Sequence, residues 1–152
     1  MVEIIRADIS HLEEVAPLFD AYRQFYGQEP NLALAREFSR ERFIALESVI
    51  FLARQVAHVG SGSAIGFVQL YPIFSSIGCR RALILNDLYV ASEFRRHGVA
   101  RQLMQAATEY AKLVGAEYLE LATQVGNTKA QALYESLGYK RDSEFYHYVL
   151  VL

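Results

Sequence analysis

Cysteine is almost absent from this chain of 152 residues, which contains only Cys79. One cysteine cannot form an intramolecular disulfide, and no paired Cys/His spacing indicates a zinc site. The first residues lack the basic start and the sustained apolar stretch of a secretory signal. No segment has the roughly 18 uninterrupted apolar residues that are needed to span a bilayer. These absences predict a soluble, cytoplasmic protein that binds neither a metal nor a membrane.

An excess of charge is also missing, because the formal net charge is only -2 and charged residues make up 21% of the chain. Attraction of the whole chain to nucleic acid is therefore excluded, and any basic site must be local. Hydrophobic residues make up 53%, which at this length suits one compact core. We find no repeat, low-complexity tract or linker, and we expect residues 1–152 to form a single domain.

The spacing of apolar residues predicts a mixed α/β fold. Apolar stripes at helical spacing predict amphipathic helices, and alternating stretches rich in β-branched residues predict strands. Ser39 suggests a break in the second helical region, and the glycine and serine cluster from Gly60 to Ser63 predicts a hairpin loop. The expected strands lie at about 2–7, 49–53, 65–70, 81–90, 118–123 and 145–152, and the expected helices at about 12–26, 31–47, 99–114 and 127–137.

A basic turn precedes the helix predicted at 99–114. The first amides of a helix have no internal acceptors and lie at the positive end of its dipole, so this turn can bind a diphosphate. Gly98 lets a phosphate approach where a Cβ would intrude. Arg95, Arg96 and Arg101 can add charge-assisted contacts. The turn lacks the features of a P-loop or a Rossmann turn, and a solvated arginine cluster is the alternative interpretation.

Two motifs in the C-terminal half resemble those of the GNAT superfamily of N-acetyltransferases. The first is RHGVA at Arg96–Ala100, which follows the strand-type segment DLYV at Asp87–Val90. The second is NTKAQALYESLGY at Asn127–Tyr139, with an Asn and a Tyr on a helix closed by Leu-Gly-Tyr. Ala100 replaces the family's usual second glycine. The resemblance is specific over about residues 83–141, whereas the N-terminal half agrees only in the order of its elements.

The resemblance implies both a fold and a reaction. The fold would be a mixed α/β domain with a central, mostly antiparallel sheet of about seven strands, flanked by helices and splayed after the fourth strand. The reaction would be acetyl transfer from acetyl-CoA to a primary amine by direct attack in a ternary complex. We expect a small acceptor such as a polyamine or an amino acid. The alternatives are a protein or peptide acceptor and a non-catalytic CoA-sensing module, and the apolar end of the chain is compatible with a homodimer.

The resemblance also assigns cofactor-binding roles to residues. The pyrophosphate would bind the backbone amides of Arg96 through Arg101. The backbone of Leu88 and Val90 would hold the pantetheine arm like an extra strand, and Asn127 would contact that arm. The full set of expected cofactor-binding residues is Leu88, Tyr89, Val90, Arg95, Arg96, His97, Gly98, Val99, Ala100, Arg101 and Asn127.

The expected catalytic residues are Tyr134 and Asp87. Tyr134 would stand near the thioester sulfur, where a phenol can protonate the leaving thiolate, and helix packing is its alternative role. Asp87 would act as a base or as an electrostatic anchor for the amine, on the same strand face as Tyr89. Its alternative is a structural carboxylate. Glu120 is a second candidate base, and water could also relay the proton.

Four aromatic residues lie in the segment that covers the acceptor pocket in the resembled fold, namely Tyr22, Phe25, Tyr26 and Phe38. Buried aromatic side chains supply much of the core of a small domain. We therefore expect at least half of these four to pack in the core. The others would line the pocket.

Overall fold

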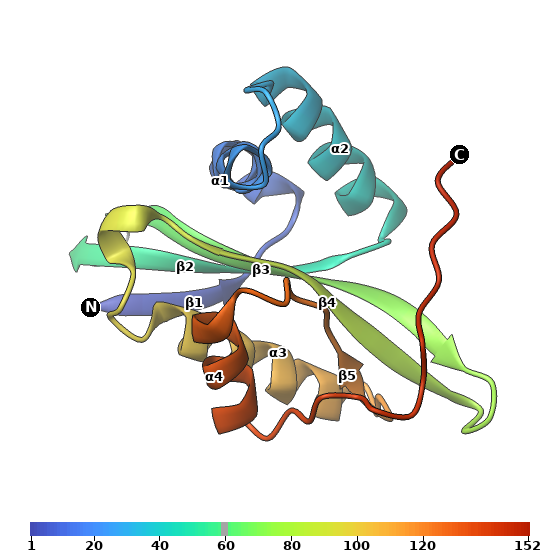
Figure 1. Cartoon of the computed structure of the whole chain (residues 1–152). Coiled ribbons are helices and arrows are strands. Elements are labelled where there is room, and N and C mark those ends of the chain that lie inside the picture. The colour runs from blue at the N-terminus through green and yellow to red at the C-terminus, as the bar shows by residue number, and fades with distance from the viewer. Residues whose placement is uncertain (59–60) are drawn as a thin grey trace. The chain divides into compact units, whose positions relative to one another are not determined.

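The computed structural model describes residues 1–58 and 61–152 and contains two compact units, Met1–Leu121 and Ala122–Leu152. Within the described residues, the larger unit holds one sheet of five strands in the order β1-β2-β3-β4-β5 (Figure 1). None of the helices described is both long and apolar enough to cross a membrane. The elements of the larger unit are β1 (Val2–Arg6), α1 (Leu12–Phe25), α2 (Leu32–Ala45), β2 (Val49–His58), β3 (Ser61–Ser75), β4 (Arg80–Val90), α3 (Val99–Leu113) and β5 (Leu119–Glu120), with short 3-10 helices at Ile9–His11 and Ser92–Phe94.

The sheet is antiparallel except at its last pair of strands. β1 to β4 pair with their neighbours in sequence in antiparallel register. β4 and β5 are parallel, because α3 crosses between them and returns the chain in the same direction. Their register joins only Leu83 with Leu119 and Ile84 with Glu120, so the part of β4 from Leu85 to Val90 has no partner on β5. This is the expected splay after the fourth strand.

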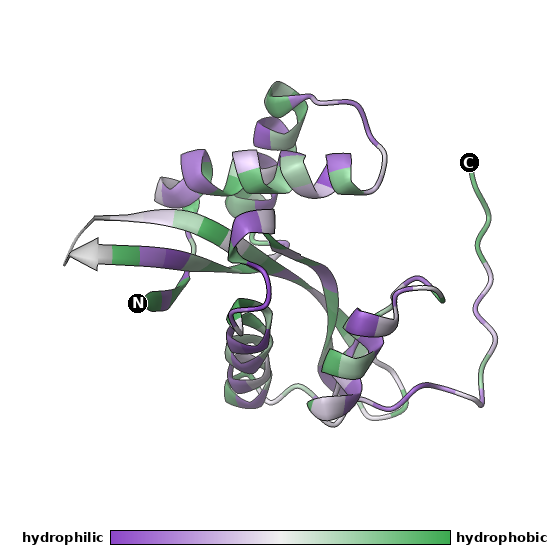
Figure 2. Cartoon of the chain, turned by 60° about the vertical axis from the view of Figure 1, so that its left-hand side comes forward, coloured by the Kyte–Doolittle hydropathy of each residue, from purple (hydrophilic) through white to green (hydrophobic). Residues whose placement is uncertain are grey.

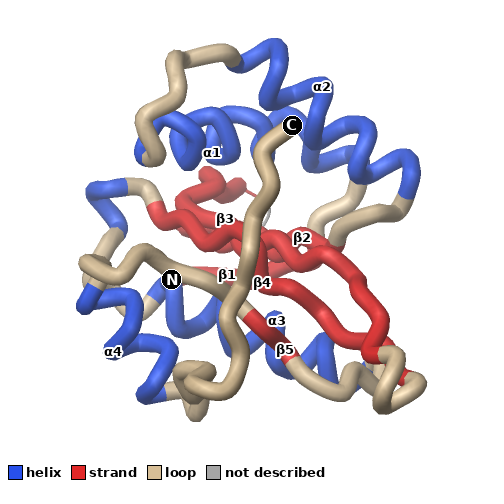
Figure 3. The backbone as a smooth tube through the Cα atoms, turned by 45° about the vertical axis from the view of Figure 1, so that its right-hand side comes forward, coloured by secondary structure: helices blue, strands red, loops and turns tan. Residues whose placement is uncertain are grey.

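Helices cover both faces of the sheet, with α1 and α2 on one side and α3 on the other (Figure 3). The ring of Phe19 on α1 contacts that of Phe67 on β3 at a centroid distance of 6.2 Å, and Phe38 of α2 stacks on Phe19 at 5.3 Å. On the other face α3 buries Leu103 and Met104 completely. Each such side chain stabilises the fold by about 1.5–3 kcal/mol. Hydrophobic and hydrophilic residues are interspersed along these elements, as amphipathic layers require (Figure 2).

The smaller unit contains α4 (Thr128–Ser136). The side-chain oxygen of Asn127 accepts a hydrogen bond from the Ala130 N–H at 3.2 Å, which caps the start of this helix. The rings of Tyr134 and Tyr139 lie 6.2 Å apart at its other end. From Leu137 onward the chain forms neither a helix nor a strand.

The mixed α/β class is confirmed, but the expected number of strands is wrong. Five strands are present among the described residues rather than about seven, and residues 145–152 form none of them. The strand expected at 118–123 is present but is limited to Leu119–Glu120. Propensity alone does not make a strand, since the backbone also needs a partner, and residues 145–152 are exposed.

Two smaller expectations about local structure also change. The expected break in the second helical region is wrong, because α2 continues through Ser39, whose hydroxyl donates a hydrogen bond to the Ala35 carbonyl at 2.9 Å. That bond keeps the serine from competing with the helix. Of the hairpin loop expected at Gly60–Ser63, Gly60 lies outside the described residues, and Ser61 already begins β3.

Candidate active site

A β-bulge on β4 sets the direction of Asp87. Leu85 pairs with Leu70 on β3 and Asp87 pairs with Gln69, so Asn86 has no partner in the register. Leu70 and Gln69 are adjacent and therefore point to opposite faces of the sheet. The bulge thus places Leu85 and Asp87 on opposite faces, although strict alternation would put them on the same one. Bulges of this kind re-aim side chains, and here the re-aimed group is the carboxylate of Asp87.

Asp87 is the centre of a buried polar cluster. Its side chain is 3% exposed, and its two oxygens accept hydrogen bonds from side-chain amides. Gln69 Nε2 donates to Oδ2 at 2.6 Å, and Asn86 Nδ2 donates to Oδ1 at 3.0 Å. The same amide of Gln69 also donates to the hydroxyl oxygen of Tyr71 at 3.0 Å. Tyr22 of α1 interacts with the carboxylate as well, which places the cluster on the face covered by α1 and α2.

Two tyrosine hydroxyls of this cluster hold their protons strongly. Burial raises the pKa of Tyr22 far above its ordinary value, and the charge of Asp87 and its hydrogen bond add to the effect. Burial and the charge of Asp87 also raise the pKa of Tyr71 to about 12, although Arg42 acts in the opposite direction. Both phenols are therefore neutral at physiological pH and can act as hydrogen-bond donors.

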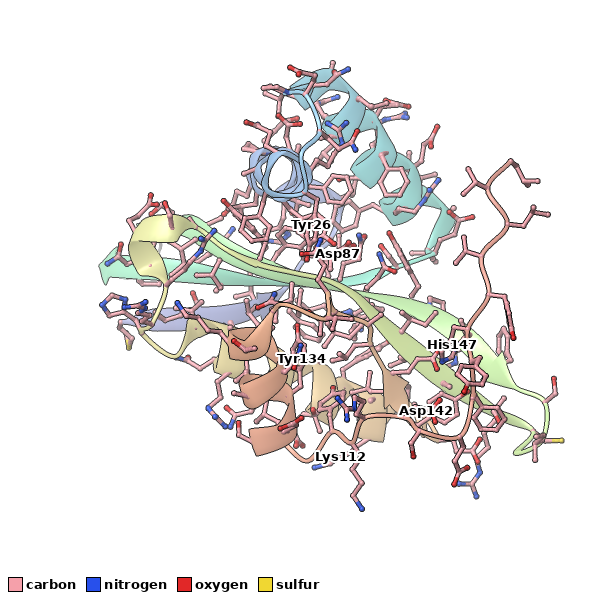
Figure 4. All side chains as sticks on the ribbon, in the orientation of Figure 1. Tyr26, Asp87, Lys112, Tyr134, Asp142 and His147 are labelled. Atoms are coloured by element: carbon pink, nitrogen blue, oxygen red, sulfur yellow. The ribbon has the colours of Figure 1, made fainter. Side chains whose placement is uncertain are left out.

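The four aromatic residues expected near the acceptor divide into two pairs. Tyr22 and Phe38 pack against the hydrophobic core. Phe25 and Tyr26 are 58% and 45% exposed, and the ring of Tyr26 meets that of Tyr22 edge-on at 5.0 Å. Tyr22 interacts both with Asp87 of β4 and with Tyr26, which is the C-cap residue of α1, and Figure 4 labels Tyr26 and Asp87. The exposed pair therefore marks the outer side of the polar cluster.

The backbone of β4 beyond the bulge presents polar groups along an open edge. The Ala91 N–H donates to the Ile65 carbonyl at 2.9 Å. In an antiparallel ladder, alternate residues bond to the neighbouring strand and the intervening ones direct their N–H and C=O groups away from it. Leu88 and Val90 are intervening residues, and β5 does not reach them. This geometry favours the expected role of their backbone in holding a pantetheine arm, which stays a prediction.

The turn before α3 leaves the first amides of that helix without helical acceptors. Gly98 is the N-cap residue with φ of 77°, and no side chain caps the helix. Apart from Gly98 itself and its neighbours along the chain, no heavy atom of the described residues lies within 4 Å of the position that a Cβ on Gly98 would occupy. Arg96 also has a left-handed backbone, with φ of 66°, which costs a residue other than glycine about 1–2 kcal/mol. The first amides of α3, at residues 99 and 100, and the space above Gly98 fit an anion.

Arg95 connects β4 to the helical side of the sheet. Its Nε donates to the Val90 carbonyl at 2.9 Å. Its guanidinium carbon lies 5.4 Å from the ring centroid of Phe25 and 5.7 Å from that of Tyr89. Arg95 is itself exposed, as are residues 96–97. Arg95 therefore stabilises the turn through contacts within the protein, and it engages the Val90 carbonyl that the resemblance assigns to pantetheine.

The remaining expected residues are Asn127, Tyr134 and Glu120. Asn127 and Tyr134 belong to the smaller unit, where Asn127 caps α4 and Tyr134 is half-buried with its ring against Tyr139. These contacts agree with packing roles, and the expected cofactor and catalytic roles stay predictions. Glu120 is exposed on β5, in register with Ile84.

Gln69 is a part of the site that lies outside both sequence motifs. It is the only residue with a polar side chain in the strand segment Ile65–Leu70, and it is 2% exposed. Because a buried polar group almost always has a hydrogen-bond partner, a lone amide in an apolar strand is a signal that could have revealed the cluster. Among residues 1–58 and 61–152, no three His, Cys, Asp or Glu side chains gather in a way that could hold a metal ion.

Comparisons with known proteins agree on one family. The model of the acetyltransferase (GNAT) family matches residues 12–139. The uncharacterised N-acetyltransferase YhfO of Bacillus subtilis (strain 168) is 43% identical over 149 residues, which cover 98% of this chain and 97% of YhfO. A crystal structure of a probable acetyltransferase has 41% identity and a TM-score of 0.90, over 99% of this chain and 97% of the other. AAC(6')-Iy, solved with a CoA-containing bisubstrate analog, has 24% identity and a TM-score of 0.76 over 100% and 99% of the two chains, a likeness of fold.

Proposed function

The chain belongs to the acetyltransferase (GNAT) family, and from this premise we propose that it moves an acetyl group from acetyl-CoA to the primary amine of a small molecule. Acetyl transfer is the reaction class of the family, and the identity of the acceptor is the new element. The observation that carries it is the buried carboxylate of Asp87, on the strand that leads into the open turn before α3. A polyamine and an amino acid are both acceptors of this general kind.

The residues of the turn fit the diphosphate of CoA. Enzymes of the family use acetyl-CoA, and the fold neighbour AAC(6')-Iy has been solved with a CoA-containing analog. The amides of residues 99–101 and the side chain of Arg96 would hold the pyrophosphate. The open edge at Leu88 and Val90 would hold the pantetheine arm, with Asn127 contacting it. When bound, acetyl-CoA supplies the acetyl thioester.

The residues of this chain would orient the amine and move its protons. An amine that binds as an ammonium first loses one proton to Asp87 or to water. During direct attack, the neutral amine nitrogen forms a bond to the acetyl carbon as the carbon–sulfur bond breaks, and the nitrogen loses a second proton while the sulfur gains one. Asp87 would hold the incoming amine and accept its proton, directly or through water. The Tyr134 hydroxyl would give a proton to the sulfur. Exchange with water returns both groups to their starting states.

Three further elements belong to this proposal. The two compact units would act together as one domain over residues 1–152. The lone Cys79 favours a cytoplasmic setting, because a reducing compartment keeps a thiol free. The exposed apolar segment Phe145–Leu152 is compatible with a homodimer.

A direct assay tests the proposed function. Purified protein is mixed with acetyl-CoA and a panel of small amines, free thiol is measured over time, and the products are identified by mass spectrometry. Thiol release with at least one small amine, matched by one acetyl group on that amine, is the expected result. Acetylation of a basic peptide but of no small amine would transfer the function to a protein acceptor. Tight binding of CoA without any release would indicate a sensing module.

A further inference from the structure

Every acid on α1 and α2 is paired with an arginine. α1 carries three acids and α2 carries two, and they lie at different depths on the two helices. The pairs are Glu13 with Arg36, Glu14 with Arg54, Asp20 with Arg23, Glu37 with Arg40 and Glu41 with Arg42. The charges of the helices that cover this face are therefore already balanced.

Asp87 lies on the face that these helices cover, and its negative charge is not paired with an arginine among the described residues. Among the ion pairs of the described residues, none includes Asp87, and its side-chain oxygens interact with the neutral side chains of Gln69, Asn86 and Tyr22. A buried carboxylate that lacks a cation bears a large desolvation cost, which neutral donors offset only in part. A positively charged ligand group would complete the cluster. Asp87 is the one buried carboxylate without an arginine in the described part of this face. The cluster can therefore pair with only one positively charged group of a ligand.

The surroundings of Asp87 are aromatic rather than acidic. Tyr22 of α1 interacts with Asp87 and meets the ring of Tyr26, the C-cap residue of α1, edge-on. Tyr89 and Phe67 are neighbours on the sheet with ring centroids 6.5 Å apart. Aromatic faces attract a cation and also pack against an apolar body. The arginines nearby already use this attraction, since Arg95 lies over Phe25 and Tyr89. At the α2 side, Arg42 lies over Phe38 with 4.5 Å to the ring centroid.

We propose that this cluster is the acceptor subsite and that it selects a primary amine with one positive charge and an apolar, preferably aromatic, body. The inference rests on the proposed function and narrows it. A second ammonium, as in a polyamine, finds no second buried carboxylate without an arginine in the described part of this face, and it meets the positive charge of Arg95. The carboxylate of an amino acid stands next to its ammonium, so it would lie against Asp87 and be repelled. Polyamines and amino acids, although both are primary amines of the general kind proposed above, are therefore poor acceptors under this narrower inference.

Matched amines test the selection. Hexylamine and hexamethylenediamine differ by one ammonium, and phenethylamine and phenylalanine differ by one carboxylate. We expect kcat/KM to be higher for the singly charged member of each pair by at least roughly tenfold, the size of effect that an unpaired or repelled charge produces at a desolvated site. Equal values, or a preference for the diamine or for phenylalanine, would overturn the subsite while leaving acetyl transfer intact.

Variants tie the selection to the cluster. Asp87→Asn keeps the shape of the side chain and should lower kcat/KM for hexylamine and phenethylamine by roughly a hundredfold, because the ammonium loses its desolvated partner. Glu37→Gln is the matched control, since it removes an exposed acid of α2 and should change neither value. A loss in Asp87→Asn that is confined to the diamine would mean that Asp87 binds a distal ammonium, which contradicts the inference.

A second variant guards against poor folding of Asp87→Asn. Tyr26→Glu adds a carboxylate at the partly exposed edge of the cluster and should raise the ratio of diamine to monoamine kcat/KM by about tenfold. An unchanged ratio in a folded variant would count against the subsite.

Calorimetric titration of the same amines into the protein with CoA, where no acetyl group is present, separates the two proposals. Preferential binding of monoamines without any turnover would retain the subsite and remove the proposed function.

Discussion

The turn before α3 presents backbone groups to a ligand, whereas the face beneath α1 and α2 presents side chains. In the turn, the geometry follows from consecutive residues, namely left-handed backbone at Arg96 and Gly98 and the first amides of one helix. On the helical face, Gln69 and Asp87 come from different strands and Tyr22 from a helix. A ligand group common to a whole family suits the first kind of site, because backbone geometry is independent of most side chains. A ligand that varies between members suits the second kind.

The largest expected effect is a loss of turnover when Tyr134, in the motif Asn127–Tyr139, is replaced. Tyr134→Phe keeps the ring that contacts Tyr139 and removes only the hydroxyl. We expect kcat to fall by roughly ten- to a thousandfold, with water supplying the proton at the lower end. The Kd of acetyl-CoA should change little. Tyr146→Phe, at a 90% exposed position, is the control that should retain full turnover. Wild-type kcat in Tyr134→Phe would assign that tyrosine to packing alone.

The next effect tests the backbone of the turn. A ligand that binds only the native state at a hundredfold excess over Kd adds about 2.7 kcal/mol to stability. Gly98→Val should remove most of the resulting rise in Tm with acetyl-CoA, because a branched side chain disfavours φ of 77° and fills the space expected for phosphate. Arg96→Glu should act in the same direction by reversing the charge.

A matched glycine separates backbone strain from lost binding. Gly115 follows α3 and also has a positive φ, of 69°, with open space around it. Gly115→Val should therefore lower the Tm of the protein without ligand, while the rise on adding acetyl-CoA stays as in the wild type. A full rise in Gly98→Val would contradict the assignment of the turn to the diphosphate.

A smaller effect is expected where the two regions meet, at Arg95. Its Nε donates to the Val90 carbonyl, and its planar group lies over Phe25 and Tyr89. Arg95→Met should raise the KM for acetyl-CoA by about tenfold, since one hydrogen bond and one cation–π contact that stabilise the turn are lost. Arg95→Lys distinguishes the two roles considered for this residue. Lysine cannot reproduce the planar fork, so it should rescue KM only if Arg95 acts as a point charge on phosphate.

The parts of the molecule that depend only on consecutive residues could be predicted from the sequence. The turn at Arg95–Gly98 and the helix capped by Asn127 lie where the motifs place them, and the splay follows from the crossover of α3. The bulge at Asn86 could not be predicted in this way, because it depends on how β4 aligns with β3. The same holds for residues 145–152, whose strand-like composition specifies no partner.

The smallest expected effect concerns stability at high pH and comes from the helical face. The pKa of Tyr71 is raised from 10.0 to about 12, and that of Tyr22 is raised further, so the folded protein keeps protons that the unfolded chain releases. The stabilisation from this difference is fully present below pH 10 and is lost as pH rises from 10 through the folded-state pKa, because the unfolded state then binds fewer protons than the native state. The free energy of unfolding, measured with urea at a series of pH values, should therefore decrease above pH 10.

Tyr22→Phe cannot release a proton at this position, and its curve of unfolding free energy against pH should fall less steeply in this range. Below pH 9 the difference between variant and wild type should be constant, which serves as the internal control and reports the loss of the hydroxyl contact with Asp87 alone. Parallel curves for the two proteins through the alkaline range would show that Tyr22 titrates alike in the folded and unfolded states, and the close contact between Tyr22 and the buried carboxylate would then be wrong.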